Sequence, residues 1–196
     1  YCEKRGVKTV GLTLSEEQAK FIRETKGLKI YIQDYRIEDP KFINQFDAVT
    51  LSGSTEHNCS ITGINNLTDN GKACDMKCNK TRTNDVFKLA KKYLKENGKI
   101  HINALVISDN YEFTTYDKLQ AYTIERHYGG RYSRFSDFKK SITDANLKIL
   151  DIKDTTVDYH YCSVADKDFF GCFSVIELND YNVLYRLRFL NLEYLI

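Results

Sequence analysis

Short apolar runs and one amphipathic segment follow one another in the first third of the chain. Residues 28–33 alternate between apolar and polar side chains, as a half-buried strand does. Ser15 and Gln18 stand three positions apart, which is the spacing of a capping box at a helix N-terminus. Gly27 supplies a C-terminal stop for that helix. The pattern therefore predicts one helix between Ser15 and Gly27 and three strands, at residues 7–13, 28–33 and 46–51.

The rest of the chain continues the alternation of helices and strands. A helix is expected over residues 84–97, followed by a buried strand over residues 100–107. Ser136 is expected to cap another helix, which precedes a late strand at 147–152. The apolar tail, residues 166–196, suggests a helix and an edge strand. On the inward faces of the two helices we expect Val86, Leu89, Ala90, Tyr93 and Leu94, and then Phe138, Ile142 and Ala145.

Strands that alternate with helices predict an α/β fold with a doubly wound sheet. Such sheets bind their ligands at the carboxyl ends of the strands. Residues 58–83 are polar and show no periodicity, so we expect an inserted surface loop there. The 196 residues fit a single domain, 1–196.

Composition limits the class of function. A net charge of +2 argues against a dedicated nucleic-acid binder. The sequence has no apolar run of ~18 residues and no signal segment, so we expect a cytoplasmic protein. Six cysteines are too few for a disulfide framework and predict reduced thiols. Cys74 and Cys78 near His57 suggest zinc, but no second pair has ligand spacing, and we predict no metal site.

Four short motifs at predicted strand ends resemble the S-adenosylmethionine-dependent cyclopropane-fatty-acyl-phospholipid synthase family, which includes the mycolic acid cyclopropane synthases. They are Thr13-Leu14-Ser15-Glu16-Glu17-Gln18, Gln33-Asp34-Tyr35-Arg36, Phe46-Asp47 and Glu56-His57. A weaker similarity continues through residues 98–105, Gly129-Gly130 and residues 158–161. The resemblance implies a Rossmann-like class I methyltransferase sheet with helices on both faces, and a role in lipid biosynthesis. The first strand and the glycine-rich loop of that fold are missing from the sequence and are expected upstream of Tyr1.

The resemblance also implies S-adenosylmethionine as the cofactor. Asp34 follows a predicted strand, where an acidic side chain can accept a hydrogen bond from the adenine amino group beside Tyr35. The alternative is a solvated aspartate at a strand end. The family's motif places Thr13, Leu14 and Gln18 along the ribose and adenine. The expected cofactor-binding residues are Thr13, Leu14, Gln18, Gln33, Asp34 and Tyr35.

Glu56 is the residue that we expect at the reacting end. In the family, a methyl group is transferred to the double bond of an acyl chain, and a bound bicarbonate then removes a proton as the cyclopropane ring closes. The resemblance implies that Glu56 holds this bicarbonate, together with Asn103, which takes the place of the family's histidine, and Tyr161. Asparagine can hydrogen-bond an anion but cannot share a positive charge with it. A glutamate exposed after a strand is the alternative, while His57 is expected to be structural and His101 lies on the same strand as Asn103.

Residues 108–135, rich in tyrosine, arginine and threonine, are expected to cover the active site. Stacking on nucleobases is the alternative, which the low net charge disfavours. The expected partner is a lipid acyl chain, with peripheral contact to a membrane, or a small molecule. The alternatives in function are a small-molecule N-methyltransferase on the same scaffold and a non-catalytic remnant of the fold. The sequence leaves the oligomeric state open.

Overall fold

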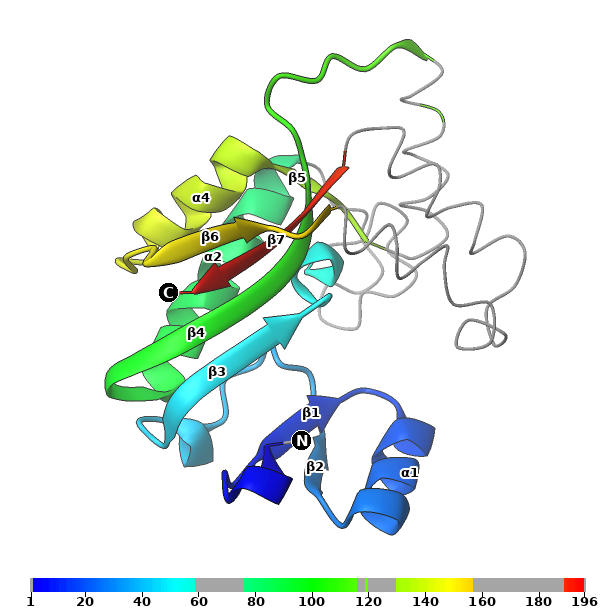
Figure 1. Ribbon diagram of the computed structural model, residues 1–196, viewed down its shortest axis with the longest axis vertical. Helices are drawn as coiled ribbons and strands as arrows, with labels where there is room; N and C mark the ends of the chain where they lie inside the picture. The colour runs from blue at the N-terminus through cyan, green and yellow to red at the C-terminus, as the bar shows by residue number, and fades with distance from the viewer. Residues whose placement is uncertain (1, 59–75, 116–118, 120–129, 157–188, 196) are drawn as a thin grey trace. The chain divides into compact units, whose positions relative to one another are not determined.

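The computed structural model describes residues 2–58, 76–115, 119, 130–156 and 189–195 (Figure 1). The chain divides into two compact units, Tyr1–Lys41 and Phe42–Ile196. We describe each unit by itself.

Unit 1 is a βαβ arrangement with a short 3-10 helix, η1 (Glu3–Arg5), before it. Strand β1 (Val10–Thr13) and strand β2 (Lys29–Ile32) are parallel, with Val10 opposite Lys29 and Thr13 opposite Ile32. Helix α1 (Glu16–Lys26) connects them. Its N-cap Ser15 accepts a hydrogen bond from the Gln18 N–H at 3.1 Å, and Gly27 ends it at a φ of 64°. Both predicted ends of this helix are confirmed.

Unit 2 begins at Phe42, the last residue of η2 (Pro40–Phe42), and contains a sheet in the order β3–β4–β7–β6 (Figure 1). Strands β3 (Phe46–Ser52) and β4 (Leu94–Ile107) are parallel. Strand β7 (Phe189–Leu195) is antiparallel to both β4 and β6 (Asp151–Asp154). The strand expected in the tail is therefore an inner strand, and its prediction as an edge strand is wrong. An apolar strand pattern shows burial but not which strands are neighbours.

Two helices of unit 2, α2 (Met76–Tyr93) and α4 (Phe135–Asp144), pack against each other on one face of this sheet (Figure 1). The ring centroids of Phe87 and Phe138 are 5.5 Å apart in an edge-to-face arrangement. The expected inward residues of both helices are buried. Alternate residues of β4 are buried in the same core and are each 0% exposed, namely Ile100, Ile102, Ala104 and Val106.

Several predicted boundaries of unit 2 need correction. Residues 76–83 belong to α2 rather than to a surface loop, while residues 59–75 of that loop lie outside the described residues. Thr83 is 1% exposed and accepts a hydrogen bond from the Asn58 side chain at 3.2 Å. A hydropathy pattern marks such a residue as polar and therefore does not show that it is buried. Helix α2 ends at Tyr93 and β4 begins at Leu94, both earlier than predicted, and the late strand lies at 151–154.

The N-terminus of α4 is capped differently from the prediction. Ser136 is a residue of the helix, and its N–H and hydroxyl donate hydrogen bonds to Asp109 Oδ1 at 3.1 and 2.8 Å. The capping carboxylate therefore comes from a residue distant in sequence. Nowhere in the described part of the chain is a helix both long enough and apolar enough to cross a membrane.

Candidate functional site

The expected cofactor residues of unit 1 meet at the carboxyl ends of β1 and β2. Thr13 is the last residue of β1, and its hydroxyl donates a hydrogen bond to Gln18 Oε1 at 2.8 Å. The backbone carbonyl of Thr13 accepts the N–H of Gln33 at 2.9 Å. Leu14 follows at the same end and is 48% exposed. Because β1 and β2 are parallel, their ends carry these residues to one edge of the sheet.

Asp34 is 6% exposed and is engaged within its own loop. Its Oδ1 accepts from the Arg36 backbone N–H and from Arg36 Nε, both at 2.9 Å. Its Oδ2 accepts from Arg36 Nε at 3.1 Å and Nη2 at 2.7 Å. These contacts use the carboxylate's four or so lone-pair positions. Burial raises the pKa of Asp34, but the hydrogen bonds and charge of Arg36 lower it more, so that its pKa lies below the usual value.

Arg36 of this loop and Lys41 of η2 were not among the expected site residues. Lys41 Nζ forms an ion pair with Asp39, lies 3.5 Å from Gln33 Oε1 and stands 4.0 Å from the ring centroid of Tyr31. The sequence held one signal for the role of Arg36, its place two positions after Asp34, since an aspartate carboxylate often bonds the backbone N–H two residues further on. Gln33 and Asp34 each therefore have a cationic partner, Lys41 for Gln33 and Arg36 for Asp34.

Glu56 of unit 2 lies on the 3-10 helix η3 (Thr55–His57), directly after β3, and is 7% exposed. Its Oε1 accepts a hydrogen bond from the Leu105 backbone N–H at 2.6 Å, and the Thr55 hydroxyl lies 3.3 Å from Oε2. Burial raises the pKa of Glu56, which these hydrogen bonds offset only in part. Among the described residues it has no cationic partner. The alternative of an exposed glutamate is therefore wrong.

The Glu56 carboxyl fills a gap along one edge of β4. Strand β3 ends at Ser52, where the Gly53 N–H still donates to the Asn103 carbonyl at 2.9 Å. Strand β5 (Ser133–Arg134) pairs with Val106 and Ile107 further along. Between them the N–H of Leu105 points to the same edge, because alternate residues of a strand bond to the same neighbour. The carboxyl accepts this bond where no strand is present.

Asn103 lies two residues before Leu105 on β4, opposite Ser52 of β3, and is half-buried. His101 is on the same face of the strand, opposite Thr50. The structure thus brings Glu56 and Asn103 to the same end of the β3–β4 pair. Tyr161 lies outside the described residues. Across the ranges described, no group of three or more His, Cys, Asp and Glu side chains could hold a metal ion.

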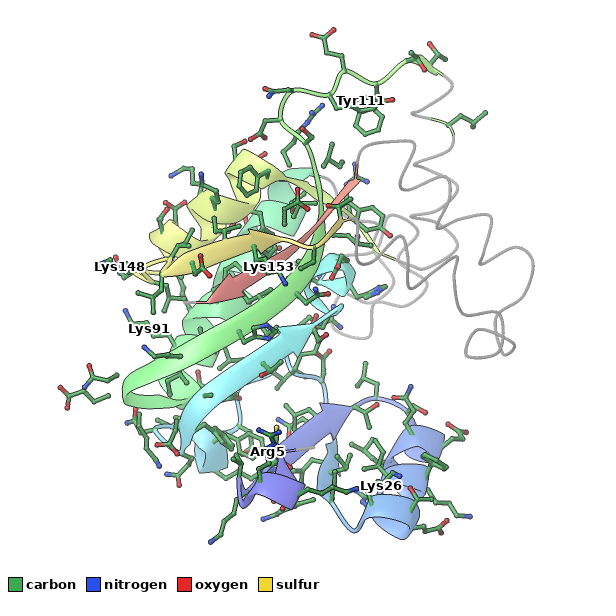
Figure 2. All side chains as sticks on the ribbon, in the orientation of Figure 1. Arg5, Lys26, Lys91, Tyr111, Lys148 and Lys153 are labelled. Carbon is green, nitrogen blue, oxygen red and sulfur yellow. The ribbon has the colours of Figure 1, made fainter. Side chains whose placement is uncertain are left out.

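The end of the expected cover, residues 108–135, contacts Glu56. The Arg131 N–H donates to the Glu56 backbone carbonyl at 2.7 Å, and Gly130 lies directly beside it. The start of the segment is held by Arg134, whose Nη1 donates to the carbonyls of Ser108 and Tyr111, each at 2.8 Å. Figure 2 shows Tyr111 on the segment that follows β4. The end of the segment is therefore bonded to Glu56, and the start of the segment is bonded to Arg134 near that end.

No family model matches the chain, and no curated protein matches it either. Solved structures do. A geranyl diphosphate C-methyltransferase from Streptomyces coelicolor A3(2) aligns with a TM-score of 0.72 at 16% identity, over 99% of this chain and 65% of that one. A cyclopropane synthase from Mycobacterium tuberculosis and a proposed sarcosine dimethylglycine methyltransferase from Galdieria sulphuraria each align with a TM-score of 0.67 at 14% identity, over 99% of this chain and 71% of theirs.

These similarities establish the fold. It is the Rossmann-like α/β fold of class I methyltransferases, as predicted. The chain spans 65% of the length of the first of these structures.

Proposed function

We propose that this protein is an S-adenosylmethionine-dependent methyltransferase that resembles the cyclopropane-fatty-acyl-phospholipid synthases and transfers a methyl or methylene group to an unsaturated acyl chain of a lipid. The similarity over 99% of the chain to methyltransferase structures carries this proposal. Two such structures were determined with S-adenosylmethionine or S-adenosylhomocysteine, and a mycolic acid cyclopropane synthase with S-adenosylhomocysteine and CTAB.

The residues at the ends of β1 and β2 suit the nucleoside part of this cofactor. Thr13 fixes the Gln18 carbonyl oxygen, which leaves the exposed Gln18 amide group to donate to an acceptor such as a ribose hydroxyl. The Asp34–Arg36 pair closes the turn that presents Tyr35. We therefore assign Thr13, Leu14, Gln18, Gln33 and Tyr35 to direct cofactor contact, and Asp34 to the loop that orders it.

Glu56 and Asn103 are our candidates for the reacting end. The bound cofactor supplies an electrophilic methyl group. Methyl transfer to an alkene carbon would break the carbon–sulfur bond of the cofactor and leave a carbocation on the substrate, and closure of the ring would then require a group that accepts a proton. A buried carboxyl that has no cationic partner among the described residues is a suitable proton acceptor, either directly or through bicarbonate that Asn103 helps to bind.

A small-molecule N-methyltransferase is the second candidate. Asn103 replaces the histidine of the cyclopropane synthases, and the proposed sarcosine dimethylglycine methyltransferase is as similar as the cyclopropane synthase, with a TM-score of 0.67 for each. An amine nucleophile can lose its proton to solvent and needs no anion site. Asn103→His should then leave the activity on amines unchanged, while it raises cyclopropane formation if the substrate is a lipid.

Calorimetry with S-adenosylmethionine and methyl-transfer assays test the proposal. We expect binding that Gln18→Ala weakens and that Glu24→Gln, on the same helix, leaves unchanged. Transfer of labelled methyl to unsaturated phospholipid would support the lipid substrate, and transfer only to sarcosine or dimethylglycine would support the second candidate. If the protein neither binds the cofactor nor transfers methyl to any of these substrates, the methyltransferase proposal is wrong and the chain is a non-catalytic remnant.

A further inference from the structure

Gly130 lies closer to Glu56 than any residue with a side chain could. A Cβ atom at this position would stand 2.8 Å from the Glu56 carbonyl oxygen and 3.3 Å from His57 Nδ1. The first contact is with backbone, which cannot rotate away as a flexible side chain can.

The backbone conformation of Gly130 does not require glycine. The described glycines with positive φ are Gly6, Gly27 and Gly53, and Gly130 is not among them. Glycine is therefore needed at this position for the close approach of two backbones and not for its conformational freedom.

Two hydrogen bonds and one strand pairing join Glu56, β4 and the end of the 108–135 segment. The Leu105 N–H holds the carboxyl at 2.6 Å, and the Arg131 N–H holds the carbonyl of the same residue at 2.7 Å. The second bond can form because Gly130 has no side chain. Strand β5, which follows Arg131, pairs with Val106 and Ile107 of β4. We call Glu56, Leu105, Gly130 and Arg131 the Glu56 cluster.

We propose that Gly130 is a positioning residue for the Glu56 carboxyl: its missing side chain lets the 130–131 backbone close on η3 and keeps the carboxyl buried against the Leu105 N–H. This inference rests on the proposed function of Glu56 at the reacting end. The charged or titratable residues that the described contacts place next to Glu56 are His57, the following residue of η3, and Arg131, whose backbone N–H bonds the Glu56 carbonyl.

Gly130→Ala tests the proposal in the full chain. The new methyl group must push η3 away, and water then reaches the carboxyl. By carbon-13 NMR of the glutamate side chains, we expect Glu56 to titrate above the ordinary range in the wild type and to shift toward it in Gly130→Ala. The Leu105 amide resonance should shift upfield as its hydrogen bond lengthens. If the protein is active, the acidic limb of its pH–rate profile should shift in the same direction.

Gly27→Ala is the control, because it strains a backbone with a φ of 64° but meets no atom within 4 Å. It should lower stability without moving the titration of Glu56. A Gly130→Ala protein in which the Glu56 titration and the Leu105 amide are unchanged overturns the proposal. This readout needs no cofactor and no substrate, so it separates a wrong positioning role from a wrong function.

If Gly130→Ala does not fold, the wild-type protein supplies a second measurement. The Leu105 N–H bonds the side-chain carboxyl of Glu56, and the Arg131 N–H bonds its backbone carbonyl. Both amide resonances should therefore shift with pH at the titration midpoint of Glu56. An Arg131 amide that does not respond at that midpoint overturns the coupling between the segment and the carboxyl.

Discussion

At the scale of single residues, Glu56 is both a hydrogen-bond acceptor for β4 and a buried ionisable group. Substitution can separate the two roles. Glu56→Ala leaves the Leu105 N–H without its acceptor and should lower the free energy of unfolding by about 1–3 kcal/mol. Glu56→Gln keeps an oxygen for this bond and should cost much less at neutral pH. Chemical denaturation of both variants at pH 7 checks this difference, and equal losses would contradict it.

The raised pKa of Glu56 also predicts a pH dependence. Between the ordinary pKa of a glutamate and its raised value, the folded state binds more protons than the unfolded state. Stability from this group therefore falls as pH rises through that window, and Glu56→Gln should remove this fall. Thermal denaturation from pH 4 to 8 measures both slopes.

Asp34 should behave in the opposite way, because its pKa lies below the usual value. Its contribution is present above the pKa of an unfolded aspartate and is lost as pH falls through the folded value. Arg36→Gln removes a partner whose side chain is 12% exposed and should cost roughly 3 kcal/mol at neutral pH. Lys20→Gln, in an exposed pair with a 4.0 Å separation, is the control and should cost little. The stability lost by Arg36→Gln relative to the wild type should therefore shrink as pH falls through this range, whereas the small loss from Lys20→Gln should not change. Acid titration of the three proteins followed by circular dichroism measures both differences.

At the scale of elements, the carboxylate of Asp109 joins the segment after β4 to the first turn of α4. Removal of an N-cap acceptor costs about 1 kcal/mol, so Asp109→Ala should lower the free energy of unfolding by that amount. Glu112→Ala is the control, since Glu112 is an exposed carboxylate of the same segment. Urea denaturation of the two variants measures the difference. A loss as large in the control would mean that the cap contributes nothing specific.

The elements also show how far local sequence patterns reach. The Ser15 cap, the Gly27 stop and strand β3 follow from neighbouring residues and were predicted correctly. The start of α2 was not, because its first turns contain the polar residue Thr83 at a buried position. Within the candidate site, the Thr13–Gln18 contact could be expected from their shared motif. The ion pair between Asp34 and Arg36 could not be expected, since several partners for Asp34 were equally compatible with the sequence.

At the scale of the whole molecule, the two units differ in how much apolar surface they bury. Ala19 is the one described apolar residue of unit 1 that is buried, while Val7, Phe21 and Ile32 are about half exposed or more. We therefore expect the amides of β1 and β2 to exchange with deuterium faster than those of β4. S-adenosylmethionine should slow exchange in β1 and β2 if their ends bind it. Mass-spectrometric exchange with and without the cofactor tests both points, and equally slow exchange in all three strands would contradict the first.

The sequence by itself determined the α/β class, the amphipathic faces of its helices and the residues available at the strand ends, because periodicity, capping and turn residues act over a few positions. The tertiary structure alone decided three further features. Strand β7 lies between β4 and β6, Asp109 caps α4 across 27 positions, and Glu56 bonds Leu105 across 49. Each depends on a partner distant in the chain, and a hydrogen-bonding group carries no local signal of which distant group it will meet.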